Sequence, residues 1–300
     1  MNENSDRTFG LPIHGWLGVA TLTLGETGLL LQISWIATWF TPIMWTGFIL
    51  LGSGLLQRWR GRSWFSSHWK ELPLIALLSI LVWLLFEAYN LHLVNWIYQG
   101  LPASAFWRDL GYFWSFATIM PGVFITYLLL DAMLPQADGQ DTSQISGWDH
   151  CIQGVWFLLG LLLVILPLLF STEVASYLFA LVWIGYIFLL DPVNELLGEP
   201  SIRRQWQYGR LRPTAIWLMA GMVCGLLWET WNFQAFMAEG AYWIYTVPTG
   251  LRLTGLQFGQ MPLLGLLGFP PFALELRAFY LFLRKVLGGK RVFGETLISE

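Results

Sequence analysis

Long apolar stretches alternate with short polar segments along the whole chain. A helix that crosses a membrane needs about 20 predominantly apolar residues, and about eight stretches of this kind occur. The pattern predicts an all-α integral membrane protein, with a multi-pass chain in the cell membrane. The expected spans are residues 14–32, 41–57, 72–95, 110–130, 152–170, 174–192, 213–235 and 259–283.

The second half of the chain repeats features of the first. A Trp-x-Gly-aromatic-Ile segment, a Leu-Leu-aromatic-Glu-x-aromatic-Asn segment and a Trp-Ile-Tyr segment occur in the same order in both halves. This order predicts two parallel four-helix repeats, related by a pseudo-two-fold axis along the membrane normal. The matching segments are 45–49 with 183–187, 84–92 with 226–234, and 96–98 with 243–245.

The repeats divide the chain into three parts. We expect a first four-helix repeat at 1–135, a polar cytoplasmic connector at 136–150, and a second four-helix repeat with a basic C-terminal tail at 151–300. Each repeat has a proline within its fourth predicted helix, Pro121 and Pro271. Because proline lacks an N–H, we expect a kink or a break at both positions.

Basic residues predict the orientation, since cytoplasmic loops are enriched in Lys and Arg. Most lie between the second and third predicted helices, between the sixth and seventh, or after the eighth. We therefore expect both termini to be cytoplasmic, and the loops that contain Arg108 and Arg252 to face outward. The cytoplasmic set is Arg58, Arg60, Arg62, Lys70, Arg203, Arg204, Arg210, Arg212, Arg284, Lys285, Lys290 and Arg291.

Composition supports the membrane assignment and excludes other classes. The chain is 56% hydrophobic and only 12% charged, which is not typical of a soluble protein. A net charge of −3 gives no reason to expect nucleic acid as a partner. Cys151 and Cys224 have no metal-ligand spacing and no phosphate-binding motif occurs, so we expect neither a metal nor a cofactor.

Aromatic residues make up 17% of the chain, with 19 tryptophans. Such residues form belts at the two membrane interfaces. They also line pockets for flat apolar ligands. Both interpretations fit the sequence.

The repeated Glu-x-x-Asn element is the main candidate site. Positions i and i+3 share a helix face, so Glu87 with Asn90, and Glu229 with Asn232, each form one polar patch. A carboxylate that faces lipid is costly, so we expect both to face the interior, toward the other half. Burial favours the protonated carboxyl, which can act as a general acid. We therefore predict catalytic roles for Glu229 and Glu87.

Further residues extend these two patches as candidate binding residues. The alternative is structural: two polar clamps that join the halves by interhelical hydrogen bonds. The candidate binding residues are Asn232, Asn90, His92, Gln234, Trp228, Trp231, Tyr245 and Glu275.

One segment resembles a known family. An acidic helix is followed by Ala-Tyr-Trp-Ile-Tyr-Thr at 241–246 and by Gln-Met-Pro-Leu at 260–263, which opens an apolar helix. This order is similar to the membrane-embedded carotenoid-biosynthesis proteins, namely the small-subunit type of lycopene cyclase and the carotenoid hydratase. The resemblance implies duplicated helix units that hold a long isoprenoid chain.

The match differs between the two family types. The adjacent glutamates of the cyclase pattern are absent, because Leu263, Leu264 and Gly265 stand there. Glu229 matches the acidic position of the hydratase pattern, and Glu87 is its counterpart in the first half. The resemblance thus implies acid-initiated chemistry on an isoprenoid.

Three functions fit these observations. The first is binding or modification of an isoprenoid or carotenoid-like lipid, with an apolar ligand and the membrane as partners. The second is a non-catalytic subunit of a larger membrane complex, with other membrane subunits as partners. The third is a transporter or channel that uses the paired glutamates.

Overall fold

A computed structural model describes residues 10–135, 150–248, 250 and 255–298. Helices dominate it, which confirms the all-α class, and the strands are short. The longer helices are α1 (Ile13–Leu30), α3 (Phe40–Arg60), α4 (Glu71–Leu93), α5 (Ala105–Met133), α6 (His150–Ile165), α8 (Phe179–Leu196), α10 (Arg212–Met237) and α12 (Phe269–Val286). The short elements are α2 (Ser34–Thr38), β1 (Trp96–Gln99), η1 (Leu166–Leu169), α7 (Thr172–Ala175), α9 (Ile202–Gln207), β2 (Tyr242–Tyr245), β3 (Gln257–Phe258), β4 (Met261–Pro262), α11 (Leu263–Leu266) and α13 (Lys290–Phe293).

Seven helical segments of the described chain are long and apolar enough to cross a membrane, which indicates a membrane protein. They match the second to eighth predicted spans. The first predicted span, α1, is not among them, although it is 18 residues long. His14, Glu26 and three threonines lower its mean hydropathy.

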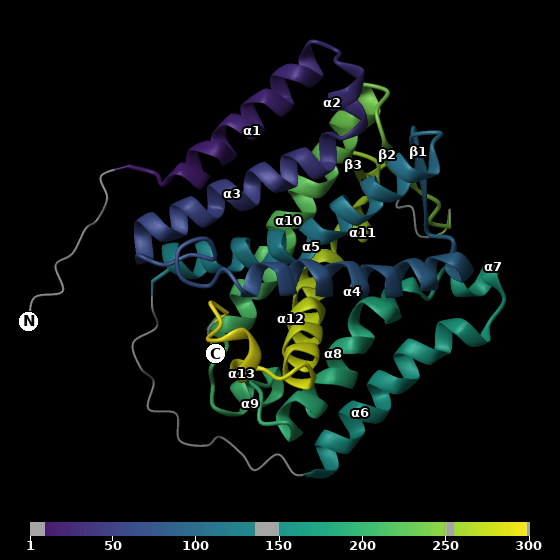
Figure 1. Cartoon of the computed structure of the whole chain (residues 1–300). Coiled ribbons are helices and arrows are strands. Elements are labelled where there is room, and N and C mark those ends of the chain that lie inside the picture. Colours follow the sequence, from purple (N-terminus) through teal and green to yellow (C-terminus); the bar gives the residue numbers. More distant parts are fainter. Residues whose placement is uncertain (1–9, 136–149, 249, 251–254, 299–300) are drawn as a thin grey trace, which may run out of the picture.

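The long helices pack in the same order in two groups. In the first unit, α1 packs against α3, α3 against α5, and α5 against α4. In the second unit, α6 packs against α8, α8 against α12, and α12 against α10. In Figure 1, α1 and α3 lie at the top and α6 and α8 at the bottom, with α4, α5, α10 and α12 between them. The two units meet chiefly where α5 packs against α10.

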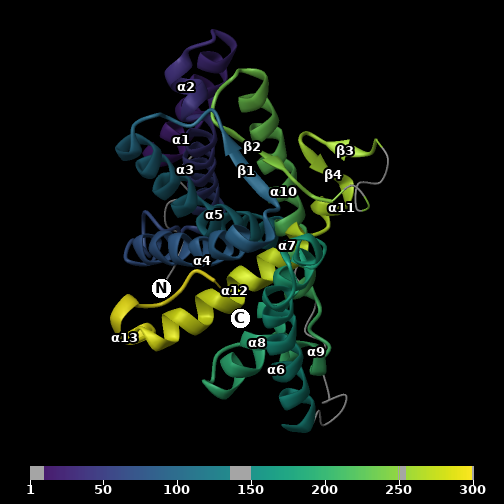
Figure 2. The ribbon, with the colours of Figure 1, turned by 90° about the vertical axis from the view of Figure 1, so that its right-hand side faces the viewer.

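Strands β1 and β2 join the units beside these central helices (Figure 2). They pair antiparallel, with Ile97 opposite Ile244 at the centre of the register. Opposed residues share a face of the ribbon, so all four aromatic residues at positions 96, 98, 243 and 245 point to one side. Gly100 follows β1 with φ +65°, and a Cβ there would collide with the carbonyl of Gly240. Only glycine fits this close crossing.

Neither proline breaks the helix in which it lies. Pro121 lies inside α5, which continues to Met133 without a break. Pro270 and Pro271 fall in the first turn of α12. The N–H groups of a first turn have no partner within the helix, so proline removes no helical hydrogen bond there. The apolar run is interrupted just before the two prolines, between α11, which ends at Leu266, and α12, which begins at Phe269.

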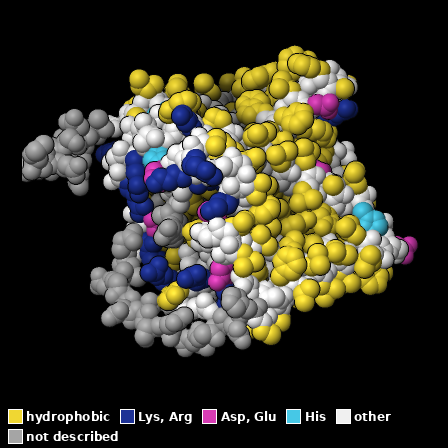
Figure 3. Space-filling model, turned by 60° about the horizontal axis from the view of Figure 1, so that its bottom comes forward, with side chains coloured by type: hydrophobic (Ala, Val, Ile, Leu, Met, Phe, Trp, Pro, Cys, Tyr) yellow, Lys and Arg dark blue, Asp and Glu magenta, His cyan; other side chains and the backbone are white. Residues whose placement is uncertain are grey.

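Basic side chains gather at one end of the molecule, shown by the dark blue patch in Figure 3. Asp131, at the end of α5, is nearly buried between two of them. It accepts from Arg60 of α3 at 2.8 Å and from Arg212 of α10. Asp131 thereby links α3 and α5 of the first unit to α10 of the second unit.

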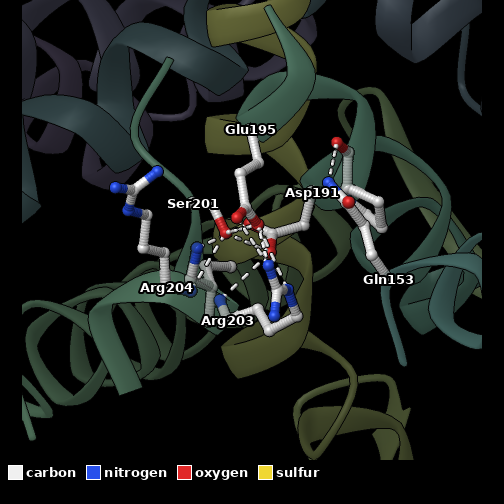
Figure 4. Close-up of polar contacts among 8 residues, drawn as sticks. Gln153, Asp191, Glu195, Ser201, Arg203 and Arg204 are labelled. Atoms are coloured by element: carbon white, nitrogen blue, oxygen red, sulfur yellow. Dashed lines mark hydrogen bonds and ion pairs between the residues drawn. The ribbon is translucent and has the colours of Figure 1, made fainter. Parts of the chain in front are cut away.

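A second carboxylate closes the turn into α9 (Figure 4). Asp191 accepts the backbone N–H groups of Ile202 at 2.6 Å and Arg203 at 3.0 Å, and the hydroxyl of Ser201 at 2.9 Å. Glu195, one turn further along α8, pairs with the guanidinium of Arg203. The first turn of α9 is thus satisfied by acids of α8.

A third buried carboxylate, Glu71, binds the C-terminal segment. It lies in the first turn of α4 and accepts from Trp64 at 3.0 Å and from Tyr280 of α12 at 2.5 Å. It also accepts the hydroxyl of Thr296 and the backbone N–H of Leu297, the latter at 3.1 Å. Four donors from three parts of the chain therefore converge on one side chain.

Candidate functional site

Each Glu-x-x-Asn element holds the strand that follows it. In the first unit, the Asn90 side-chain amide donates to the carbonyl of Trp96 at 2.9 Å. Its oxygen accepts the N–H groups of Asn95 at 2.8 Å and Trp96 at 3.2 Å. The asparagine thereby supplies hydrogen-bond partners for the backbone N–H and C=O of Trp96, the first residue of the strand. A two-stranded ribbon alone leaves some of these backbone groups unpaired.

The second unit repeats this arrangement. The Asn232 amide donates to the carbonyl of Trp243 at 2.9 Å, and its oxygen accepts the N–H of Trp243 at 2.9 Å. Trp243 is the counterpart of Trp96. Asn90 and Asn232 are thus placed as strand anchors, and these hydrogen bonds go to the backbone of their own unit.

The glutamates bind the tyrosine of the same strand. Glu87 accepts from the Tyr98 hydroxyl at 2.6 Å, and from the indoles of Trp83 at 2.9 Å and Trp96 at 3.1 Å. All three donors belong to the first unit. The hydrogen-bond partners of Glu87 thus come from its own helix and the strand that follows it, and not from the other half.

At Glu229 the corresponding contact is part of a chain of two hydrogen bonds, from Trp243 to Tyr245 and from Tyr245 to Glu229. The Tyr245 hydroxyl donates to Glu229 at 2.5 Å and accepts from the indole of Trp243 at 2.7 Å. Both partners again belong to the carboxylate's own unit. The two sites differ in that Trp96 reaches its glutamate directly, whereas Trp243 reaches the tyrosine.

The two tyrosines remain protonated at neutral pH. Enclosure in the protein raises the pKa of the Tyr98 hydroxyl, and the negative charge of Glu87 raises it further. Enclosure and Glu229 act in the same way on the pKa of Tyr245. Both hydroxyls therefore serve as neutral donors.

The aromatic face of the ribbon forms one wall of a cavity of about 100 Å³ between the two units. The other walls come from α3, α4, α5, α8, α10 and the start of α12. Aromatic side chains dominate the lining, and no carboxylate is part of it. Its aromatic residues are Trp39, Trp45, Trp83, Trp96, Tyr98, Tyr112, Phe116, Trp183, Trp228, Tyr242, Trp243, Tyr245 and Phe269.

The structure brings some of the predicted site residues to this cavity. Trp228 and Tyr245 line it, and Glu87 and Glu229 lie directly behind its wall, each bonded to a lining tyrosine. Trp228 stands at the centre of the aromatic group, with ring centroids 5.5 Å from Trp83 and 5.7 Å from Trp243.

Other predicted site residues lie elsewhere. Trp231 is buried against Trp45, with centroids 4.9 Å apart. His92 contacts the carbonyl of Phe170 at 2.9 Å, and Gln234 donates to Glu26 at 3.0 Å.

Glu275 is fully buried in α12 and accepts the backbone N–H of Tyr186 at 3.0 Å. It is not part of the cavity lining. It joins α12 to α8 inside the second unit.

Sequence reasoning missed several lining residues. Tyr98 is the clearest case, because the identity of 96–98 with 243–245 made it the counterpart of Tyr245. Trp183 was noted only as part of a repeat. Arg108 was assigned to an outer loop, whereas it lies in the first turn of α5 and lines the cavity.

No group of three His, Cys, Asp or Glu side chains in the described ranges could hold a metal ion. No family model, no curated protein and no solved structure matches this chain.

Proposed function

We propose that this chain is a multi-pass membrane protein that binds a long, flat isoprenoid or carotenoid-like lipid in the aromatic cavity. The observation that carries the proposal is the cavity itself, which seven tryptophans from both units surround. Aromatic walls with few polar groups suit an apolar conjugated ligand. Belts at a membrane interface would not require these rings to converge between the units.

The proposal includes the membrane topology. Eight spans, with α1 as the first, form two parallel four-helix repeats. Four features support this duplication: the shared packing order, the matching strand anchors, the matching glutamate–tyrosine pairs, and the symmetric register of β1 and β2. The basic end is cytoplasmic, in line with the bias of positive charge toward that side.

We also propose acid-assisted chemistry on the bound lipid, which would make the protein an enzyme. In the pairs Glu229–Tyr245 and Glu87–Tyr98, a tyrosine that lines the cavity donates its hydroxyl to a carboxyl group behind it. A proton on the carboxyl can reach the cavity through the tyrosine, which gives up its own proton as it accepts that of the carboxyl. The resemblance to the carotenoid-biosynthesis proteins points to the same class of substrate.

Binding is tested by purification in a mild detergent, followed by an absorption spectrum and mass spectrometry of bound lipids. We expect a polyene or prenyl lipid to copurify with the wild-type protein. Trp228→Leu removes the central ring of the cavity and should lower the bound amount about tenfold, as expected for the loss of one aromatic contact at a binding site. Trp16→Leu is the control, because Trp16 is 59% exposed on α1.

An empty wild-type protein, or equal loss of bound lipid in both variants, would overturn the binding proposal and favour transport.

The proposed catalysis has its own test. Glu229→Gln keeps an acceptor for Tyr245 but removes the acidic proton, so we expect turnover of the identified lipid to fall at least about a hundredfold. Undiminished turnover in Glu229→Gln would contradict acid catalysis by Glu229 and would leave the binding proposal intact.

A further inference from the structure

The cavity lining contains one charged side chain, Arg108. It lies in the first turn of α5, and its side chain is 40% exposed, so it marks the mouth of the cavity. Its Nε donates to the neighbouring carboxylate of Asp109 at 3.3 Å. Exposed pairs of this kind contribute little, and the two terminal nitrogens make no hydrogen bond to the part of the chain that the structure describes.

Arg108 stands where a basic residue is not favoured. The N-terminus of a helix carries partial positive charge, so acidic residues are preferred in the first turn and basic ones in the last. α5 is 29 residues long, and its first turn, which ends at Arg108, contains no acidic residue. The positive end of the α5 dipole therefore adds to the attraction that the guanidinium exerts on an anion.

Another donor of the cavity lining has no partner within the described residues. The hydroxyl of Thr41, in the first turn of α3, lines the cavity and is buried, and it has no hydrogen-bond partner within the described residues. α3 packs against α5. A buried donor that stays unpaired costs free energy, which an acceptor group of a ligand would offset.

We propose that the lipid of this cavity is anionic: a carboxylate or phosphate end binds Arg108 at the mouth, and the apolar chain extends among the tryptophans. This inference rests on the proposed binding of a long apolar lipid and adds the chemistry of its head group. The guanidinium suits both head groups, because its fork of N–H donors matches their paired oxygens.

The test uses two fluorescent polyenes, cis-parinaric acid and its methyl ester, which have the same chain and differ in charge. Binding is measured by energy transfer from protein tryptophans in detergent at pH 8. We expect both to bind the wild-type protein, and the acid to bind about tenfold more tightly, as one charge-assisted hydrogen bond provides. Arg108→Gln should reduce the acid-to-ester affinity ratio from about tenfold to about one.

Arg210→Gln is the matched control, since it removes the same charge from an exposed position at the basic end. It should change neither affinity. Equal binding of acid and ester, or an unchanged preference in Arg108→Gln, would overturn the anionic head group while the lipid site stands. Failure of both polyenes to bind would overturn the lipid site as well.

A further arm separates a lipid anion from a small free anion. Sodium phosphate in tenfold excess over the acid should leave the acid bound, because the chain supplies most of the affinity. Displacement of the acid by that amount of phosphate would overturn the proposal in favour of a simple anion site.

Discussion

At the scale of single residues, the two glutamate–tyrosine pairs are alike in position but differ in how their hydrogen bonds are shared. Glu87 has three donors, of which Tyr98 is one. Tyr245 is both the donor to Glu229 and the acceptor for Trp243. Removing a hydroxyl should therefore have unequal effects in the two units.

We predict that Tyr245→Phe lowers the free energy of unfolding by about 2–3 kcal/mol, because it leaves a buried carboxyl and a buried indole N–H short of a partner. Tyr98→Phe should cost about 1 kcal/mol, since two indoles still donate to Glu87. Thermal unfolding in detergent, followed by near-UV circular dichroism, measures both. Equal losses would contradict the different hydrogen-bond sharing.

At the scale of elements, close helix contacts depend on glycine at particular crossings. A Cβ on Gly160 of α6 would collide with the backbone of Phe188 and Leu189 on α8. Gly154 lies in the same helix, and a Cβ there would meet no atom within 4 Å. Small residues allow this approach of two backbones in membrane proteins.

We therefore predict that Gly160→Leu destabilises the protein by about 1–3 kcal/mol, the usual range for overpacking. Gly154→Leu serves as the control for helix propensity and added hydrophobicity, and it should leave the unfolding temperature nearly unchanged. A similar loss in both variants would show that the α6–α8 crossing is not the cause.

Most long elements follow from the sequence, because seven apolar runs coincide with seven helices that are long enough to span a membrane. The strands do not follow from it. Four residues such as Trp-Ile-Tyr-Gln contain no periodicity that separates a strand from a helix end. The pairing of β1 with β2 also joins segments about 147 residues apart, since Ile97 opposes Ile244.

The site was predicted in part for a similar reason. The repeat drew attention to Glu87, Asn90, Glu229 and Asn232, but helix periodicity describes only neighbours on the same helix. Their partners lie on the strands that follow, so the direction of each side chain depended on the fold of a loop. The start of α12 could have been predicted, since consecutive prolines favour the first turn of a helix.

At the scale of the whole molecule, the uneven charge distribution gives a direct test of topology. Ser104 is exposed at the N-cap of α5, and Arg210 is exposed just before α10. In a Cys151→Ser background, we predict that a membrane-impermeant thiol reagent labels Ser104→Cys in intact cells. Arg210→Cys should react only after the membrane is opened. Cys224 is buried and should not contribute.

The opposite labelling pattern would reverse the proposed orientation, and labelling of both positions in intact cells would contradict a span between them. Permeabilised cells provide the positive control for both variants.

The hydrogen bonds between Glu71 and the C-terminal segment determine when this part of the molecule can assemble during synthesis. Thr296 follows Glu71 by 225 positions in the chain. At about 5–20 residues per second, roughly 11–45 s separate the appearance of the carboxylate from that of its hydroxyl partner. During that interval the start of α4 has to remain in contact with water or another protein, so this corner of the molecule closes late in its assembly.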